Sequence, residues 1–231
     1  ITRKKTPAGE AAQKSSAVGV FSVGIYRKGA AGKLNAKEKS QENKTGDIPR
    51  GGRLADYVYH YLSPLGGITL SSNGTELTGL WFDGQKYFGN TLAKEYAEQA
   101  LPIFEQTVRW LDTYFREKAP DFTPPILMKT TPFRKAVWKI MLEIPFGQTM
   151  TYGEIADRLV KQYGLSKMSA QAVGGAVGHN SVSLIIPCHR VVGTNGSLTG
   201  YAGGIHKKEQ LLELERADMR RFFLPEKGTA L

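Results

Sequence analysis

The chain contains one cysteine, Cys188, among its 231 residues. A single thiol cannot form an intramolecular disulfide, and it has no second cysteine with which to share a structural zinc ion. Two uses remain for it, as an inert thiol in the core or as a nucleophile. The shortage of cysteine therefore directs attention to the residues around Cys188.

Long apolar runs are also absent from the sequence. The longest candidate, residues 18–26, is far shorter than the roughly 20 apolar residues that span a bilayer. It also lacks the layout of a secretory signal followed by a cleavage site. We therefore expect no membrane association and a reducing compartment in which a free thiol survives, cytoplasmic and, in a bacterium, close to the nucleoid.

Acidic residues are scarce only at the start of the chain. The formal net charge is +10, and residues 1–53 hold 12 Lys and Arg against 4 Asp and Glu, whereas the other residues hold 19 against 17. We expect residues 1–53 to form a basic and largely disordered leader, with a short element near residues 18–26. Such a leader either binds polyanions without sequence preference or is a solvated extension, and the sequence leaves both readings open.

Residues 54–125 are expected to form an N-terminal domain built on a small antiparallel sheet, because short β-patterned segments alternate with turn signals. A helical pattern follows, and a proline-rich break then ends the domain. The expected elements are strands at residues 57–62, 68–70 and 77–82, a hairpin turn at Asn73-Gly74, and a helix from about Thr91 to Glu117 that Pro102 splits or kinks.

Residues 126–221 are expected to form a helical C-terminal domain, with a tail at residues 222–231, and the fold class is α+β. Two of its short helices flank a Gly-containing turn, which fits a helix-turn-helix, although such pairs also occur as plain core. The expected elements are a helix from Thr131-Pro132 to about residues 145–147, a helix opened by the capping box Thr151-x-x-Glu154 and ended by Gly164, a helix capped by Ser169 and reaching about Gly178, a turn at Asn195-Gly196, and a helix from about Ile205 to Arg221.

The neighbours of Cys188 favour a nucleophile. His189 and Arg190 follow it directly, and we expect their positive charge to favour the thiolate, the form that attacks electrophiles. On the last helix, Lys208 lies four residues before a leucine and Glu215 four residues after one, so both project from the apolar face. Buried charges need partners, which are either each other or the groups of a site.

Three separated motifs occur in order and at close spacing. They are Ala172-Val173-Gly174-Gly175-Ala176-x-x-x-Asn180, Ile186-Pro187-Cys188-His189-Arg190-Val191, and Gly200-Tyr201-x-Gly203-Gly204-x-x-x-Lys208-x-x-Leu211-Leu212-x-x-Glu215. Together they resemble the methylated-DNA–protein-cysteine methyltransferases, the family that removes alkyl groups from O6 of guanine in DNA. The motifs cover about residues 133–215, the order of strands and helix extends the resemblance over residues 56–131, and residues 1–53 lie outside it.

The resemblance implies a DNA repair enzyme that moves the alkyl group from O6-alkylguanine, with O4-alkylthymine as a second candidate, to its own Cys188 in one irreversible turnover. His189 would activate the thiol through a bridging water, and Glu215 would hold His189 in orientation. Tyr152 would help to rotate the phosphate and would donate a proton to the departing guanine. Arg190 would be structural. No cofactor is implied, and the partner is double-stranded DNA that carries alkylated guanine, bound by a protein monomeric in solution.

The resemblance also implies a pocket for a base that is rotated out of the duplex. Val191, Tyr201, Ala202 and Lys208 match the groups that line this pocket. Asn180 matches the side chain that ties the recognition helix to the active-site segment.

The helix that begins near residue 169 would enter the minor groove of the DNA. Its small residues Ala172, Gly174 and Gly175 suit a close approach of the backbone to DNA, and they would equally suit tight helix packing. The family usually has an arginine in this helix that fills the gap left by the flipped base, but this chain has Gln171. Since glutamine is shorter and uncharged, we expect weaker DNA binding or slower base flipping, unless Lys167 compensates.

A second departure concerns metal. Some relatives carry zinc in the N-terminal domain, but His60 is the only histidine before the active-site region and the only cysteine lies within that region. We therefore expect no metal site.

Other classes of protein explain fewer of these residues. A helix-turn-helix regulator accounts for the helix pair and the basic leader, but it leaves Cys188 and Glu215 unexplained. A cysteine hydrolase normally takes its histidine from a distant segment, whereas His189 is adjacent to the thiol. A non-catalytic relative that only recognises alkylated DNA has tryptophan where this chain has Cys188.

Overall fold

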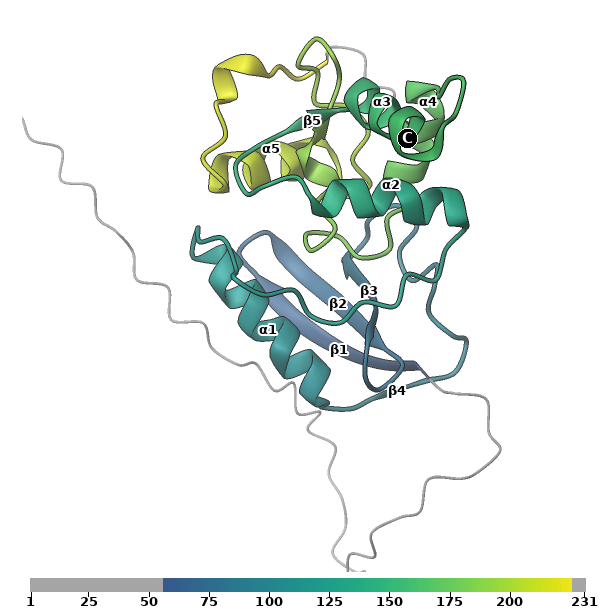
Figure 1. The fold of residues 1–231 in the computed structure, drawn as a ribbon. Helices are drawn as coiled ribbons and strands as arrows, with labels where there is room; N and C mark the ends of the chain where they lie inside the picture. The colour runs from purple at the N-terminus through teal and green to yellow at the C-terminus, as the bar shows by residue number, and fades with distance from the viewer. Residues whose placement is uncertain (1–55, 226–231) are drawn as a thin grey trace, which may run out of the picture. The chain divides into compact units, whose positions relative to one another are not determined.

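The structure is a computed structural model that describes residues 56–225 (Figure 1). The predicted leader at residues 1–53, with its short element at residues 18–26, lies outside the described residues, as do residues 226–231 of the predicted tail. Within residues 56–225, no helix combines the length and the apolar character needed to cross a membrane.

The N-terminal part is built on a four-stranded sheet with the order β3-β2-β1-β4. The strands β1 (Asp56–Ser63), β2 (Gly66–Ser72) and β3 (Leu77–Phe82) pair antiparallel, which confirms the predicted sheet. A fourth strand, β4 (Tyr96–Glu98), adds a parallel edge beside β1. The sequence did not predict β4 because its three residues are all exposed and therefore carry no apolar alternation.

The β2–β3 hairpin turns at Asn73 and Gly74, as predicted. The side-chain Oδ1 of Asn73 accepts hydrogen bonds from the amides of Thr75 at 3.0 Å and Glu76 at 2.8 Å. Gly74 has a φ of +109°, a conformation that costs glycine little.

The first helix, α1 (Pro102–Phe115), packs against β1 and β2 (Figure 1). The prediction that this helix starts near Thr91 was wrong, because residues 96–98 form β4 instead. Pro102 opens the helix and does not kink it. Proline suits a first helical position because the N–H that it lacks would have no partner inside the helix.

The C-terminal part is helical, and the two helices predicted as a helix-turn-helix, α3 and α4, are present and contact each other. The helices are α2 (Pro132–Leu142), α3 (Tyr152–Tyr163), α4 (Ala170–Gly178) and α5 (Ile205–Leu214), and two-residue strands β5 (Met150–Thr151) and β6 (Val191–Val192) pair in parallel.

Local signals start and end these helices as predicted in most places. The capping box of Thr151 and Glu154 opens α3, Gly164 ends it with a φ of 63°, and the Ser169 hydroxyl caps α4. Two ends were predicted too far along the chain: α2 ends at Leu142, and α5 ends at Leu214, followed by a separate 3-10 helix at Met219–Arg221.

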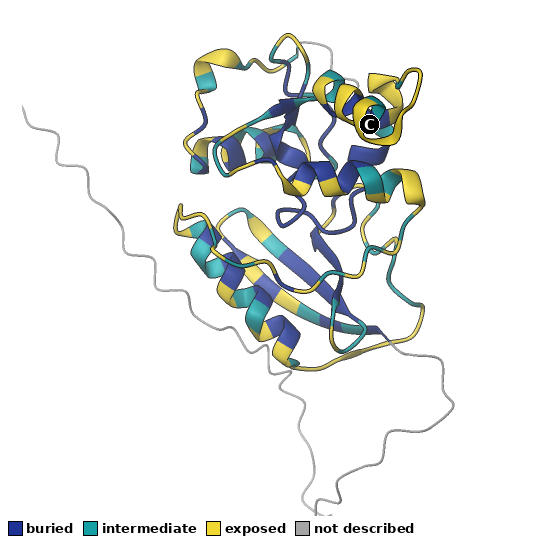
Figure 2. Cartoon of the chain, viewed as in Figure 1, coloured by how far each residue is buried: buried dark blue, intermediate teal, exposed yellow. Residues whose placement is uncertain are grey.

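One apolar core joins the sheet to the C-terminal helices, and Figure 2 shows the buried residues running through both. The backbone makes the same connection. Leu80 of β3 donates its amide to Ser181 and accepts from the amide of Ser183, each at 2.8 Å. The segment that leads to Cys188 is thus attached to the edge of the N-terminal sheet.

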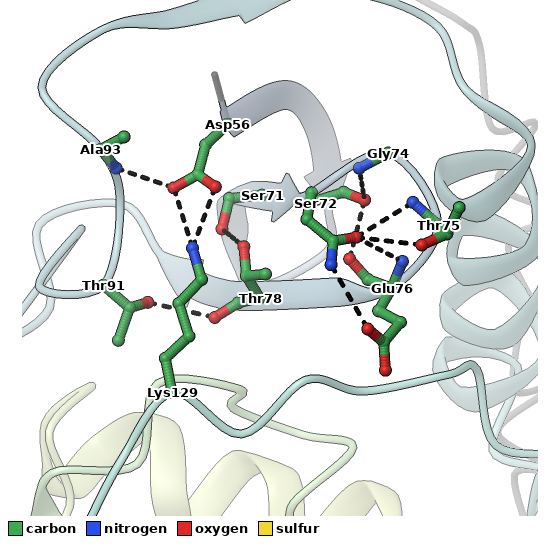
Figure 3. A network of polar contacts seen from close by, with 11 residues as sticks. Asp56, Ser71, Ser72, Gly74, Thr75, Glu76, Thr78, Thr91, Ala93 and Lys129 are labelled. Atoms are coloured by element: carbon green, nitrogen blue, oxygen red, sulfur yellow. Dashed lines mark hydrogen bonds and ion pairs between the residues drawn. The ribbon is translucent and has the colours of Figure 1, made fainter. Parts of the chain in front are cut away.

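A polar network secures the long loop between β3 and β4 (Figure 3). The Asp56 carboxylate accepts from the Ala93 amide at 2.8 Å and from the Lys129 ammonium at 3.0 Å. The Thr91 hydroxyl donates to the Thr78 carbonyl at 3.1 Å. Lys129 lies in the connection between α1 and α2, so the network ties that connection to the sheet.

Candidate active site around Cys188

Cys188 begins a 3-10 helical turn, Cys188–Arg190, at the end of a buried segment. Its side chain is 3% exposed. The Asn180 amide donates to the sulfur at 3.2 Å and to the carbonyl of Ile186 at 2.7 Å. Leu184, in the same segment, has a φ of 67°, which is strained for a branched side chain. The thiol is therefore held in place by its segment and by Asn180.

The electrostatics of the thiol differ from the prediction. Burial raises the pKa of Cys188, and the Asn180 hydrogen bond and the Lys208 ammonium oppose this only in part. The prediction that charge on His189 and Arg190 favours the thiolate was wrong, because burial lowers the pKa of His189 and the Arg190 guanidinium is paired with Glu215. The resting thiol therefore keeps its proton and needs a base to remove it.

His189, the next residue in the same 3-10 turn, is the candidate for that base. Its Nε2 lies 2.7 Å from Oε1 of Glu215, and its side chain is fully buried. Since the carboxylate only accepts, Nε2 carries the hydrogen and Nδ1 carries the free lone pair. Nδ1 is buried and has no hydrogen-bond partner among the described residues. Burial lowers the pKa of His189 even though Glu215 opposes it, so the ring is neutral near pH 7 and able to take a proton.

Glu215 is the most densely bonded side chain of the site. Beyond His189, it accepts from Nε and Nη2 of Arg190 at 2.9 and 3.0 Å, from the Gly147 amide at 3.0 Å and from the Tyr114 hydroxyl at 2.7 Å. Burial alone would raise the pKa of Glu215, but His189 and Arg190 together lower it well below its usual range. Glu215 is therefore a fixed anion, and its predicted burial is confirmed, although it caps the end of α5 and does not lie within it.

Arg190 and Gly147 surround this carboxylate. Nη1 of Arg190 donates to the Ile144 carbonyl at 2.6 Å, which agrees with the structural role expected of it. Gly147 has a φ of 75°, and a Cβ there would lie 2.7 Å from the carbonyl oxygen of Glu215. Only glycine fits this position.

A second set of hydrogen bonds centres on Lys208, one of the residues predicted to line the base pocket. The Lys208 ammonium, fully buried, donates to the carbonyls of Val191 at 2.5 Å and Thr199 at 2.6 Å. Burial lowers the pKa of Lys208 to about 7. The Tyr152 hydroxyl also donates to the Thr199 carbonyl, at 3.1 Å. Lys208 therefore fastens the strand that follows Cys188 to the loop before Tyr201.

Tyr201 and Ala202 belong to that loop. The Tyr201 ring stands edge-on to His189, with ring centroids 6.4 Å apart, and its hydroxyl is buried with no partner among the described residues. The Ala202 carbonyl accepts from the amide of Lys86, at 3.0 Å. The loop is thus held from the N-terminal part as well.

The predicted DNA-contacting residues lie on α4. Gln171 and Ala172 are exposed at the start of α4, whereas Gly174 and Gly175 are half-buried. A Cβ on Gly174 would lie 3.8 Å from the Tyr152 ring, and a Cβ on Gly175 would meet nothing within 4 Å. The structure therefore leaves the start of α4 and the side at Gly175 open.

Sequence reasoning missed Tyr114 and Gly147. Tyr114 lies on α1, 101 residues from the carboxylate that it contacts, so no local spacing could have connected the two. A signal did exist at Gly147, because glycine after Pro145-Phe146 indicates a constrained turn, but it did not indicate a partner.

Family models match both halves of the described chain. Residues 57–128 match the ribonuclease-like domain of 6-O-methylguanine DNA methyltransferase, and residues 132–217 match its DNA binding domain. The chain belongs to the 6-O-methylguanine DNA methyltransferase family. The family predicted from the motifs is therefore confirmed, and so is the α+β fold class.

Curated relatives agree with this membership. The methylated-DNA–protein-cysteine methyltransferase of Mycobacterium tuberculosis is 40% identical over 155 residues, which cover 67% of this chain and 89% of the relative. The protein of the same name from Haemophilus influenzae is 36% identical over 161 residues, which cover 69% and 86%. Among solved structures, Mycobacterium tuberculosis OGT in complex with DNA has a TM-score of 0.60 and 37% identity, and the match covers 72% of this chain and 94% of that one.

Proposed function

We propose that this protein repairs duplex DNA by transferring the alkyl group of O6-alkylguanine to the sulfur of Cys188, once per molecule. The observation that carries the proposal is a buried thiol that accepts from the Asn180 amide and is followed directly in the chain by a histidine bonded to a buried carboxylate. The family membership and the DNA complex of a relative support DNA as the partner.

The transfer balances with the groups present. The proton of the Cys188 thiol passes to Nδ1 of His189 through a bridging water, and Glu215 stabilises the imidazolium that forms. The sulfur then attacks the alkyl carbon, so a carbon–sulfur bond forms as the carbon–oxygen bond breaks. The electron pair leaves with guanine, and the Tyr152 hydroxyl donates a proton to it. The product thioether has no ionisable proton and is a poor leaving group, so the reaction ends after one turnover.

Burial of the thiol requires the base to come to it. With Cys188 3% exposed, a guanine stacked inside a duplex cannot reach the sulfur. The base must therefore be rotated out of the stack, and α4, with its exposed small residues, is the element that we assign to the minor groove. On the resemblance of the motifs, we assign the carbonyl of Val191 and the backbone of Tyr201 and Ala202 to the flipped base, and we expect the carbonyls now bonded to Lys208 and Lys86 to move when it enters.

A non-catalytic protein that only recognises damaged or undamaged DNA is the weaker alternative. Such a protein has no use for a neutral buried imidazole or for a carboxylate that accepts hydrogen bonds from five donors. We also propose that the protein acts as a monomer in the cytoplasm, since one chain supplies every proposed catalytic group and a reducing compartment preserves the thiol.

Incubation with a duplex that contains one O6-methylguanine should add the mass of one methyl group to the intact protein. The gain should stop at one group per chain however much DNA is present, because Cys188 is consumed. Intact mass spectrometry checks the gain, and fragmentation should place it on Cys188. The same duplex with unmodified guanine is the control. A protein whose mass stays unchanged, or that takes up several methyl groups, would contradict the proposed function.

Replacing Gln171 with arginine should tighten binding to duplex DNA by about fivefold at low salt, because one more cation displaces counterions from the phosphates. The slope of log affinity against log salt should steepen by roughly 0.9. Fluorescence anisotropy at several salt concentrations checks both values.

Gln171→Lys is the matched control, because it adds charge without the planar group that fills the gap of a flipped base. It should tighten binding yet accelerate transfer less than Gln171→Arg does. If neither binding nor the transfer rate changes in Gln171→Arg, this position is not the one that enters the duplex. A marked loss of binding in Lys167→Ala would identify Lys167 as the compensating cation.

A further inference from the structure

The active-site cluster includes one side chain from the N-terminal part of the protein, the Tyr114 hydroxyl of α1. It donates to Oε1 of Glu215 at 2.7 Å and lies 3.3 Å from Nε2 of His189. Tyr114 has no exposed surface. A buried hydroxyl that reaches both members of a histidine–carboxylate pair is placed to influence how that pair works.

Aromatic neighbours hold the Tyr114 ring in this position. Trp110, one turn earlier on α1, stacks on it with centroids 5.3 Å apart and an angle of 8° between the planes. Phe115 and Phe146 present their edges to it, at 5.4 and 5.8 Å between centroids. Because Phe146 belongs to the turn before Gly147, both parts of the chain fix where the hydroxyl points.

The hydroxyl acts on the carboxylate as a donor. Burial, and then the neighbouring Glu215, raise the pKa of Tyr114, so the hydroxyl keeps its proton. Oε1 of Glu215 also receives Nε2 of His189 and Nη2 of Arg190. The other charged or titratable groups around the Tyr114 ring are the Arg190 guanidinium and the phenol of Tyr201. Tyr114 thus supplies an uncharged donor to this oxygen, beside the neutral imidazole of His189 and the cationic Arg190.

We propose that Tyr114 is a positioning residue for the transfer, because its hydroxyl orients Glu215 so that His189 keeps its hydrogen on Nε2 and its lone pair on Nδ1. The proposal rests on the proposed function and deepens it. It gives the N-terminal part of the chain a direct share in the active site. Removal of the hydroxyl would leave Oε1 to His189 and Arg190 alone, which raises the basicity of His189 and loosens its orientation.

The single-turnover rate of methyl uptake tests the proposal when it is measured against pH for the full chain and for Tyr114→Phe. This substitution removes one oxygen and keeps the ring that packs against Trp110, Phe115 and Phe146. We expect the rate constant to fall about tenfold. We also expect the acid limb of the profile to move to higher pH, since a more basic His189 is protonated earlier as the pH falls.

Tyr61→Phe is the matched control, because Tyr61 also donates to a carboxylate, Oδ1 of Asp112, at 2.9 Å and outside the thiol cluster. It should keep the rate and the pH profile of the parent. If Tyr114→Phe matches the parent in both readouts, or if the two variants lose rate equally with no shift of the acid limb, Tyr114 is structural only and the proposal is overturned. A parent that takes up no methyl group would instead contradict the proposed function, and the two failures are distinguished by that one measurement.

Discussion

Cys188→Ser should take up no methyl group from a duplex that contains O6-methylguanine, while its affinity for that duplex stays within about twofold of the parent. Serine has nearly the shape of cysteine, and the Asn180 amide that now donates to the sulfur at 3.2 Å can donate to the hydroxyl. An alcohol is far less acidic than a thiol and is intrinsically a weaker nucleophile. The substitution therefore removes the acceptor and preserves the surface that meets DNA.

Two measurements check this expectation. Intact mass after incubation with methylated duplex reports transfer, and anisotropy at one fixed salt concentration reports binding, since affinity for DNA depends strongly on salt. Cys188→Ala serves as the matched control, because it removes the acceptor without placing a hydroxyl in the buried position. Methyl uptake by either variant would show that Cys188 is not the acceptor. A loss of binding in both would show that the thiol itself contributes to recognition of the duplex.

The sequence predicted most of the elements because their signals are local. The capping box at Thr151, the glycine that ends α3 and the serine that caps α4 each act within one helical turn, and all three were found. Strand β4 and the start of α1 were missed, because the three exposed residues of β4 show no pattern and are fixed only by pairing with β1. Pairing partners distant in sequence leave no periodicity to read.

The site residues also divide into those with local sequence signals and those fixed by partners distant in the sequence. The burial of Lys208 and Glu215 followed from their spacing on one helix, and the structure places both among buried partners. The protonation state of the thiol could not be predicted, since it depends first on how deeply the fold buries Cys188 and then on partners such as Asn180 and Lys208. Arg190 is adjacent to His189 in the sequence, but its guanidinium pairs with Glu215, 25 residues away. Tyr114 was missed because its partner, Glu215, is also distant in the sequence.

Glu215→Gln should reduce the rate of methyl uptake by about 10²- to 10⁴-fold, the usual contribution of a positioned acid or base. It should also lower the free energy of unfolding by about 3 kcal/mol, because the buried Arg190 guanidinium loses its counter-ion. Glutamine keeps the shape of the side chain, but one carboxylate oxygen becomes an NH₂ group. That group faces a donor from Arg190, Gly147 or Tyr114 and cannot accept a hydrogen bond from it. The imidazolium of His189 would then form beside a neutral amide and be stabilised less.

The lowered pKa of Glu215 also predicts how the difference in unfolding free energy between the parent and Glu215→Gln changes with pH. The folded state lowers the pKa of Glu215, so its contribution to stability is fully present above the pKa of the unfolded carboxyl group, about 4.3. That contribution is lost as the pH falls below this value toward the folded pKa. The difference in unfolding free energy between the parent and Glu215→Gln should therefore be constant from about pH 6 upward and shrink below about pH 4. Urea unfolding at a series of pH values checks it.

Glu143→Gln is the matched control, because Glu143 also pairs with an arginine, Arg158, at 2.9 Å, but both side chains are about half exposed. An exposed pair contributes about 0–1 kcal/mol, so this variant should unfold close to the parent and transfer methyl groups at the parent rate. If the two variants behave alike, burial of the Glu215 pair has no special consequence for stability or transfer. If Glu215→Gln loses stability but keeps the parent rate, the carboxylate holds Arg190 in the fold and takes no part in activating the thiol through His189.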